Sequence, residues 1–386
     1  MKVLLFANTD WYHYNFNLPL ARVLQRQGVE VLLISPPGRF AQRLLDAGFH
    51  WIALPMNRLS LNPWEEFRLL RFIIDLYRRE RPDLVHHFTI KCVVYGSIAA
   101  RTVGVDRRVN AVTGLGHVFT SDSLRNQILR PLVRRLLQLA LTGRLSRLIV
   151  QNPDDYSAFA DEQLLAPEKI RLIRGLGVNI ERFHPRLPEA DSNPDEPRGP
   201  SRYPPLKVLL ATRLLWEKGI REYVQAARLL KNSGHDVEFL LAGDPDPGNP
   251  ASIDTAQLMA WRTEGIINFL GYVDDMPELF SRVDVAVLPS YREGLPQCML
   301  EAAACGLPLV ATDVPGCREI VEPGINGLLI PPRNSAALAE AIAHLDRNRA
   351  QCRVLGEASR RKVLQDFDEK TILRMTLNIY REILHS

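Results

Sequence analysis

Residues 283–301 read VDVAVLPSYREGLPQCMLE and show a strand, a turn and a helix in immediate succession. The run from Val283 to Pro289 is almost continuously apolar, as a parallel strand covered on both faces should be. Gly294 and Pro296 lie in the following turn, and Gln297 to Cys305 is a helix-length apolar segment. Because this order is typical of βαβ units, the sequence predicts a parallel sheet.

The same alternation fills both halves of the chain. Further strands are predicted at 2–7, 30–35, 51–54, 84–88, 108–112, 147–151, 208–212, 238–242, 267–270 and 308–312. The Pro-rich segment between the halves has little to bury and is expected to be an exposed linker. The prediction is therefore an α/β protein with two Rossmann-like, doubly wound parallel-sheet domains at 1–184 and 207–367, joined by a linker at 185–206. Residues 368–386 are expected to form a C-terminal helix that packs back on the N-terminal domain.

Composition excludes several classes of protein. With 386 residues, 46% hydrophobic and 24% charged, the chain is unlike disordered, fibrous or disulfide-rich proteins. Arginines interrupt its most hydrophobic region, so no membrane-spanning helix is predicted, and the apolar run after Met1 is too short for a signal peptide. Five irregularly spaced cysteines suit a reducing compartment. These features predict a cytoplasmic protein.

The net charge of +4 is unevenly distributed. Residues 1–184 carry 25 Lys and Arg against 16 Asp and Glu, whereas the remaining residues carry 23 against 28. The basic first half suits an anionic membrane surface or a phosphate-bearing acceptor, and it lacks the stronger basic excess expected of nucleic-acid binding. A solvated arginine-rich surface is the alternative.

The turn at residues 289–296 is the strongest candidate site. Backbone N–H groups of Gly294, Leu295 and Gln297 would lie near a helix N-terminus, which attracts anions. Glu293 and Glu301 are about two helical turns apart, so they could contact different parts of an extended, hydroxyl-rich ligand. The alternative is a glutamate at the N-cap followed by one at the surface.

A second candidate segment, TRLLWEKG at 212–219, directly follows a predicted strand. Arg213 and Lys218 provide a planar fork and a point charge, a combination that suits a diphosphate whose negative charge grows as a glycosyl bond breaks. The alternative is a surface arginine paired with Glu217 or Glu222.

Together with FLGYV at 269–273 and GLPLVATD at 306–313, these motifs resemble glycosyltransferase family 4 over the whole second half. The resemblance implies the GT-B fold, two facing Rossmann-like domains with the active site between them, and sugar transfer from a nucleotide sugar, expected to be a UDP-sugar, with retention of configuration and no metal or other cofactor. It implies that Arg213 and Lys218 hold the donor diphosphate near Gly294, Leu295 and Pro296, and that Glu293 contacts the transferred sugar. Glu301 would contact the ribose, and Tyr272 and Val273 would border the base. Arg213, Lys218 and Glu293 are thus the expected catalytic residues.

The first half is similar to a narrower group of bacterial transferases, which extend polyprenyl-diphosphate sugars with N-acetylhexosamines during polysaccharide or glycan assembly. The similarity rests on HHFTIK at 86–91, YGSIAAR at 95–101 and VTGLG at 112–116. Phe88 stands where many family members have a histidine, so His87 or Lys91 is expected to contact the acceptor instead, with Gly114 and Gly116. The alternative for both is an ordinary loop residue. A second departure is the segment from Asn8 to Asn17. It is aromatic in this chain, whereas the family has a glycine-rich loop at this place, and it is expected to shape the acceptor site.

Other candidates are weaker. The helical segment from Trp64 to Arg81 places arginines and aromatic residues on its surface, which suits either water or a peripheral contact with the inner face of the cytoplasmic membrane. The aspartate pairs Asp244 and Asp246, and Asp274 and Asp275, lack supporting metal ligands, so no metal site is predicted.

Two other functions remain open at this stage. The same two-domain fold occurs in UDP-sugar 2-epimerases, which turn over a nucleotide sugar without an acceptor. A non-catalytic scaffold would bind a nucleotide sugar and transfer nothing. A nicotinamide dehydrogenase is excluded because neither half has a Gly-x-Gly-x-x-Gly turn after its first strand.

Overall fold

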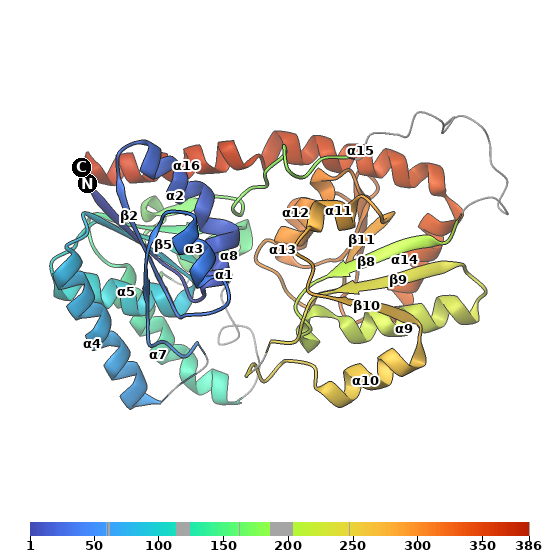
Figure 1. Ribbon diagram of the computed structural model, residues 1–386, viewed down its shortest axis with the longest axis horizontal. Helices are drawn as coiled ribbons and strands as arrows, with labels where there is room; N and C mark the ends of the chain where they lie inside the picture. Colours follow the sequence, from blue (N-terminus) through green and yellow to red (C-terminus); the bar gives the residue numbers. More distant parts are fainter. Residues whose placement is uncertain are drawn as a thin grey trace. The chain divides into compact units, whose positions relative to one another are not determined.

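A computed structural model describes residues 1–58, 60, 62–112, 124–161, 163–185, 204–246 and 248–385, without the side chains of 124–130 and 132. The chain divides into two compact units (Figure 1). The first comprises Met1–Leu176 and Ile372–Ser386, and the second comprises Gly177–Thr371. Each unit is an α/β layer structure built on one parallel sheet.

The first unit contains a seven-stranded parallel sheet in the order β3-β2-β1-β4-β5-β6-β7. Its strands are β1 (Lys2–Phe6), β2 (Glu30–Ser35), β3 (His50–Ala53), β4 (Leu84–Phe88), β5 (Arg108–Val112), β6 (Ser146–Val150) and β7 (Ile170–Leu172). The helical segments are α1 (Asp10–Tyr12), the π-helix η1 (His13–Asn17), α2 (Leu18–Arg26), α3 (Ala41–Asp46), α4 (Pro63–Glu80), α5 (Ile90–Thr102), α7 (Leu124–Leu141), α8 (Pro153–Asp161), the 3₁₀ turn η2 (Pro167–Lys169) and α16 (Glu369–Leu384).

Alternate residues of β1 bury against opposite layers of helices. Leu4 and Phe6 join a core with α4 and α5, whereas Val3 and Leu5 join a core with α2 and α16. Figure 1 shows α4 and α5 on one side of this sheet and α2 and α16 on the other. Because a parallel sheet is covered on both faces, its strands are apolar almost throughout.

The second unit contains a six-stranded parallel sheet in the order β10-β9-β8-β11-β12-β13. Its strands are β8 (Leu206–Ala211), β9 (Val237–Ala242), β10 (Ile267–Gly271), β11 (Val285–Leu288), β12 (Leu309–Thr312) and β13 (Gly327–Ile330). The helical segments are η4 (Trp216–Lys218), α9 (Ile220–Asn232), α10 (Thr255–Glu264), α11 (Met276–Phe280), α12 (Gln297–Ala304), α13 (Pro315–Ile320), α14 (Ser335–Arg347) and α15 (Arg349–Asp366). Strand order reverses between β8 and β11, and ligands of such sheets bind at this kind of crossover point.

The predicted parallel sheets are confirmed, and every predicted strand is present within about two residues of its predicted ends. Two strands were missed, β7 and β13. Both are edge strands of only three and four residues, too short for a clear period-two pattern.

Residues 177–184 belong to the second unit, although the sequence placed them in the first domain. Val178 and Phe183 are buried in the second core, and Val178 forms a parallel bridge with Asp368. The tail helix α16 packs in the first unit from Ile372 onward.

All five cysteines have free thiols. Within the described ranges, no helix combines the length and the apolar character needed to cross a bilayer.

Candidate functional site

The turn after β8 places Lys218 at the carboxyl edge of the second sheet. The 3₁₀ turn η4 ends at Gly219, whose φ of 72° and contact with the backbone of Pro289 both require glycine. A Cβ at this position would lie only 2.0 Å from the carbonyl oxygen of Pro289. The loop after β8 and the loop after β11 are therefore packed backbone to backbone, which brings residues 218 and 293 together.

Lys218 and Glu293 form an ion pair at this junction. The distance from Lys218 Nζ to Glu293 Oε1 is 2.7 Å, and the side chains are 16% and 10% exposed. This is the only hydrogen bond of the ammonium group within the described residues, so two of its three N–H donors remain for a ligand. The structure therefore brings together the two segments that the sequence singled out, at 212–219 and 289–296, through an ion pair that was not predicted.

Helix α13 packs against the backbone of the loop from Glu293 to Pro296. The N–H of Gly316 donates to the carbonyl oxygen of Glu293, at 3.3 Å, and a Cβ on Gly316 would lie 2.3 Å from the carbonyl oxygen of Gly294. Leu295 packs partly on the hydrophobic core, and buried Pro296 is the N-cap of α12 without a capping side chain. The start of α12 therefore lies directly after Glu293, and its positive dipole end favours an anion there.

Arg213 is placed by a different partner. Its Nη1 donates to Asp246 Oδ2 at 2.7 Å, and its side chain is 54% exposed while that of Asp246 is 11% exposed. Arg213 therefore pairs with Asp246 and not with Glu217 or Glu222, the alternative partners. The Glu222 carboxylate instead accepts from the Tyr291 hydroxyl at 2.9 Å. Asp246 also accepts from Asn249 Nδ2 at 3.1 Å, which fixes the carboxylate that orients Arg213.

Backbone hydrogen bonds join the loops that follow β8, β9 and β10. Leu214 N donates to Asp244 O at 3.0 Å, and Gly243 N donates to Gly271 O at 2.7 Å. Tyr272 follows Gly271 directly and is 36% exposed, while Val273 packs partly on the core. These contacts place the predicted base-bordering residues on a loop that is connected, through residues 243–244, to the segment carrying Arg213.

Glu301 lies on α12 one turn after Gln297. Burial raises the pKa of the Glu301 carboxyl to about 7, although nearby Arg182 and a hydrogen bond with Gln297 oppose this. Gln297 Nε2 also donates to the carbonyl oxygen of Gly177, at 2.9 Å. Glu301 therefore lies beside the segment that begins the second unit, and it changes charge near neutral pH.

Taken together, the second unit offers a compact anion site. Lys218 and the start of α12 both supply positive potential at the partly buried turn after β11. The ion pair with Glu293 fixes the position of the Lys218 ammonium group, which could then bind a diphosphate. Glu293 and Glu301 add two hydrogen-bond acceptors for hydroxyl groups. The arrangement suits a ligand that combines a diphosphate with hydroxyl-bearing rings.

The prediction for His87 conflicts with its environment. His87 is fully buried, and its ring nitrogens contact Asn110 Oδ1 at 2.8 Å and the Tyr77 hydroxyl at 3.1 Å. Burial lowers its pKa to about 3, so the ring is neutral. Nδ1–H then donates to Asn110, and Nε2 accepts from Tyr77. His87 is a core residue, because alternation along β4 turns it toward α4 and α5.

All the hydrogen-bond donors of the Lys91 ammonium group are also used within the protein. Its ammonium group donates to Asn57 O at 2.7 Å, Ser60 O at 3.2 Å and Glu66 Oε1 at 2.6 Å. These three bonds use all three of its N–H donors. Lys91 thus fastens α5 to α4 and to the preceding loop, which corrects its predicted contact with an acceptor. Gly114 and Gly116 lie outside the described residues.

His86 faces the other layer of the first unit. Its Nδ1 and the Tyr380 hydroxyl of α16 are 2.7 Å apart, and the ring lies 4.0 Å from that of Phe88. Burial, together with neighbouring His87, lowers the pKa of His86 well below its usual value. Neutral His86 therefore links β4 to the C-terminal helix.

Two family descriptions match the chain. The description "Glycosyl transferase 4-like" matches residues 2–152, and "Glycosyl transferases group 1" matches residues 205–348. A Bacillus subtilis protein, EpsD, named as a glycosyltransferase, is 30% identical over 97% of this chain and 95% of its own length. The chain belongs to the group 1, family 4-like glycosyltransferases.

Two further relatives of this glycosyltransferase cover nearly its whole length. One is the N,N'-diacetylbacillosaminyl-diphospho-undecaprenol alpha-1,3-N-acetylgalactosaminyltransferase of Campylobacter jejuni, which is 27% identical over 100% of this chain and 99% of its own. The other is the UDP-Gal:alpha-D-GlcNAc-diphosphoundecaprenol alpha-1,3-galactosyltransferase of Escherichia coli, which is 24% identical over 91% of both chains.

Solved structures share its fold. Sucrose-phosphate synthase from Thermosynechococcus elongatus has a TM-score of 0.78 at 21% identity and covers 100% of this chain and 99% of its own. Anabaena HepE in complex with UDP-glucose has a TM-score of 0.76 at 21% identity over 100% of both chains. The glycosyltransferase has the GT-B fold, as predicted.

The sequence did not reveal three residues that support this site. Asp246 had been considered only for a metal, Arg182 lies in what the sequence placed in the first domain, and Gly316 gave no signal of its own. The Pro315–Gly316 pair at the start of α13 was the one available hint, since glycine permits close backbone approach. Among the described residues, no group of three or more His, Cys, Asp or Glu side chains is arranged to hold a metal.

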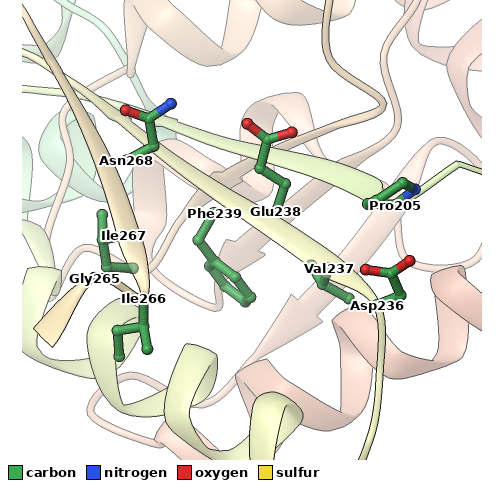
Figure 2. A pocket seen from close by; sticks show the side chains of 9 residues that line it. All are labelled: Pro205, Asp236, Val237, Glu238, Phe239, Gly265, Ile266, Ile267 and Asn268. Carbon is green, nitrogen blue, oxygen red and sulfur yellow. The ribbon is translucent and has the colours of Figure 1, made fainter.

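The glycosyltransferase also has a hollow of about 410 Å³ at the opposite edge of the second sheet. Figure 2 shows its lining residues, which come from the starts of β9 and β10 and from Pro205 ahead of β8. Its two ionisable side chains, Asp236 and Glu238, are both acidic. This hollow lies at the amino ends of the strands and would repel a diphosphate, so size alone does not identify the functional site.

Proposed function

We propose that this glycosyltransferase moves an N-acetylhexosamine or related hexose from a UDP-sugar to a lipid-linked saccharide, with retention of configuration. The observation that carries the proposal is the ion pair between Lys218 and Glu293 at the start of α12. It places a partly buried cation, an acceptor for sugar hydroxyls and a helix dipole in one position. The named activities of the Campylobacter and E. coli relatives support the choice of substrates.

In the proposed reaction, Lys218 and the start of α12 bind the donor diphosphate, and Arg213 adds a second cation. As the glycosidic bond breaks, negative charge grows on the departing UDP, and these groups stabilise it. Glu293 keeps Lys218 in place and accepts a hydrogen bond from the transferred sugar. The acceptor hydroxyl attacks the anomeric carbon on the face that UDP leaves, and its proton passes to the leaving diphosphate oxygen.

The proposal includes independence of a metal, because Lys218 and Arg213 supply the positive charge that a diphosphate needs. Glu301 is proposed to accept from the ribose hydroxyls, with Tyr272 and Val273 beside the base. Full activity in excess chelator supports this part of the proposal. Activity that chelator abolishes and Mg²⁺ or Mn²⁺ restores contradicts it.

We also propose that the first unit lies on the inner face of the cytoplasmic membrane, through helix α4. Trp64, Phe67 and Phe72 are 74%, 58% and 38% exposed. They share one arc of the helix with exposed Arg68 and Arg71. Exposed aromatic residues interleaved with arginines suit an interface with anionic lipid.

Co-sedimentation with vesicles tests this membrane contact. The protein is expected to bind phosphatidylglycerol vesicles at low salt and neutral phosphatidylcholine vesicles weakly. Trp64→Ala with Phe67→Ser should lower binding several-fold, whereas substitution of Met259, an exposed apolar residue of the second unit, should not. Equal binding by the variant and the parent protein contradicts the α4 contact.

The central experiment is a screen of UDP-sugars against short-chain polyprenyl-diphosphate saccharides, with products detected by mass. We expect a product enlarged by one hexose or N-acetylhexosamine, and NMR of its new anomeric centre should show the donor's configuration. Turnover of a UDP-sugar without any acceptor would instead indicate an epimerase. Tight UDP binding without turnover across the screen would indicate a scaffold.

A further inference from the structure

Two loops of the first unit meet at the carboxyl ends of the paired strands β1 and β2. The buried carboxylate of Asp10 joins them, because it accepts from the N–H of Trp11 at 2.8 Å and from the N–H of Phe40 at 2.8 Å. Gly38 leaves room for this carboxylate, since a Cβ there would lie 2.5 Å from Asp10 Oδ1. One buried charged group thus fixes both loops.

The turn that follows is fixed by further buried polar groups. His13 contacts the carbonyl oxygen of Ile34 through Nε2, at 2.9 Å, and Asn17 Nδ2 through Nδ1, at 3.0 Å. Burial lowers the pKa of His13 to about 4, so the neutral ring donates from Nε2 and accepts at Nδ1. Residues 13–17 form a π-helix, a rare conformation that is frequent at functional sites.

Trp11 is the exposed aromatic residue of this turn, whereas Tyr14 and Phe16 are half-buried and pack partly on the core of the first unit. Trp11 is 39% exposed and lies edge-on to Phe16, with ring centroids 5.0 Å apart. Tyr14 lies 5.1 Å from Phe40, and the guanidinium of Arg43 lies over the Tyr14 ring at 5.5 Å. We call Trp11, Tyr14, Phe16 and Arg43 the aromatic shelf.

The composition of the aromatic shelf indicates its ligand. The C–H faces of a pyranose ring are apolar and pack on a flat aromatic ring, and an indole held rigidly loses little conformational entropy on binding. Arg43 adds positive charge for a phosphate-bearing ligand. The aromatic shelf also lies at the carboxyl ends of parallel strands, where open α/β sheets bind their ligands.

We infer that Trp11 stacks on a sugar ring of the acceptor and determines how tightly the acceptor binds. This inference rests on the proposed function, because it identifies part of the acceptor site of the same transferase. It gives a role to the aromatic segment from Asn8 to Asn17. It also moves acceptor recognition from β4 and α5, where His87 and Lys91 are internal, to the ends of β1 and β2.

Steady-state kinetics of Trp11→Ala and Trp11→Phe test the inference, with the UDP-sugar and polyprenyl-diphosphate saccharide selected by the screen. For Trp11→Ala we expect the acceptor KM to rise about ten- to thirtyfold, the loss typical of one aromatic anchor, while the donor KM stays within about twofold. Trp11→Phe should retain most of the affinity. Leu139→Ala is the matched control, a change at an exposed apolar residue of α7 in the same unit, and should leave the acceptor KM unchanged.

Calorimetric titration without donor separates the sugar from the lipid. Trp11→Ala should weaken binding of the methyl glycoside of the acceptor saccharide and leave binding of farnesyl diphosphate unchanged. An unchanged acceptor KM in a Trp11→Ala variant with parental Tm, or a loss confined to farnesyl diphosphate, overturns the inference. Absence of transfer by the parent protein in the whole screen is a failure of the proposed function instead, and titration of the parent protein and Trp11→Ala with the methyl glycosides of all the saccharides in the screen still decides the role of Trp11.

Discussion

Two lysine–glutamate pairs, one in each unit, have nearly the same geometry and different roles. Lys91 and Glu66 are 2.6 Å apart with side chains 19% and 14% exposed, and Lys218 and Glu293 are 2.7 Å apart with side chains 16% and 10% exposed. Lys91 also donates to two main-chain carbonyl oxygens, whereas Lys218 has no other partner among the described residues. The number of donors left over, rather than distance or burial, separates a structural pair from one that can bind a ligand.

The largest expected effect comes from breaking the second pair. Lys218→Ala or Arg213→Ala should lower kcat/KM for the UDP-sugar about 10²- to 10³-fold, because a preorganised donor to developing negative charge is lost. Lys218→Ala should also lower the Tm, because the partly buried Glu293 carboxylate loses its cation, so the kinetics are measured well below the Tm of the variant. The matched control is Lys207→Ala, which removes a half-exposed lysine at the amino end of β8. Parental kinetics in both site variants would refute the proposed donor site.

The next prediction tests whether His87 of β4 is a core residue. His87→Ala should lower the free energy of unfolding by about 3 kcal/mol, because it leaves a cavity and removes the partners of Asn110 and Tyr77. Tyr77→Phe removes one hydrogen bond and should cost about 1 kcal/mol. Urea unfolding measures both. A raised acceptor KM in a His87→Ala protein with parental stability would restore His87 to the acceptor site.

A smaller effect is expected from breaking the first pair. Lys91→Met should destabilise the protein by about 2 kcal/mol, because Glu66 is left partly buried without its cation. The acceptor KM should not change. Combining Lys91→Met with Glu66→Leu should recover much of the stability, since no unpaired charge remains. If Lys91→Met has parental stability and a raised acceptor KM, Lys91 binds a ligand, as is proposed for Lys218, and the contrast between the two pairs is wrong.

The smallest effect concerns Glu301, whose pKa burial raises to about 7. The folded state therefore holds a proton that the unfolded chain releases at lower pH, so ionisation costs stability as the pH rises from about 4.5 through 7. Glu301→Gln removes this cost. It should raise the free energy of unfolding at pH 8 and leave it unchanged at pH 4. An equal effect at both pH values would contradict the raised pKa.

For UDP, the same variant should bind a few-fold more weakly at pH 8, where the parent protein presents a carboxylate to the ribose. Calorimetry at pH 6 and pH 8 gives this difference. UDP affinity that is identical in Glu301→Gln and the parent protein would remove Glu301 from the proposed donor site.

The sequence predicted the fold well because long apolar strands and amphipathic helices leave local patterns. The turns after β8 and β11 were predicted for the same reason, since the end of an apolar strand marks the carboxyl edge of a parallel sheet, at Thr212 in one case and at Pro289 in the other. The residues of the proposed donor site lie within about twenty positions of these turns. Short edge strands such as β13, and the start of the second unit at Gly177, had no comparable local signal.

The amino-acid sequence by itself determined two parallel α/β domains, the charged residues at the ends of β8 and β11, and the family. Only the tertiary structure decided what each charged or polar side chain contacts. His87 and Lys91 read as site residues in the sequence, but strand alternation turns the first into the core, and the fold surrounds the second with three acceptors. The physical reason is that burial and hydrogen-bond partners arise from segments distant in the chain, as with Asp246 for Arg213 and Glu66 for Lys91.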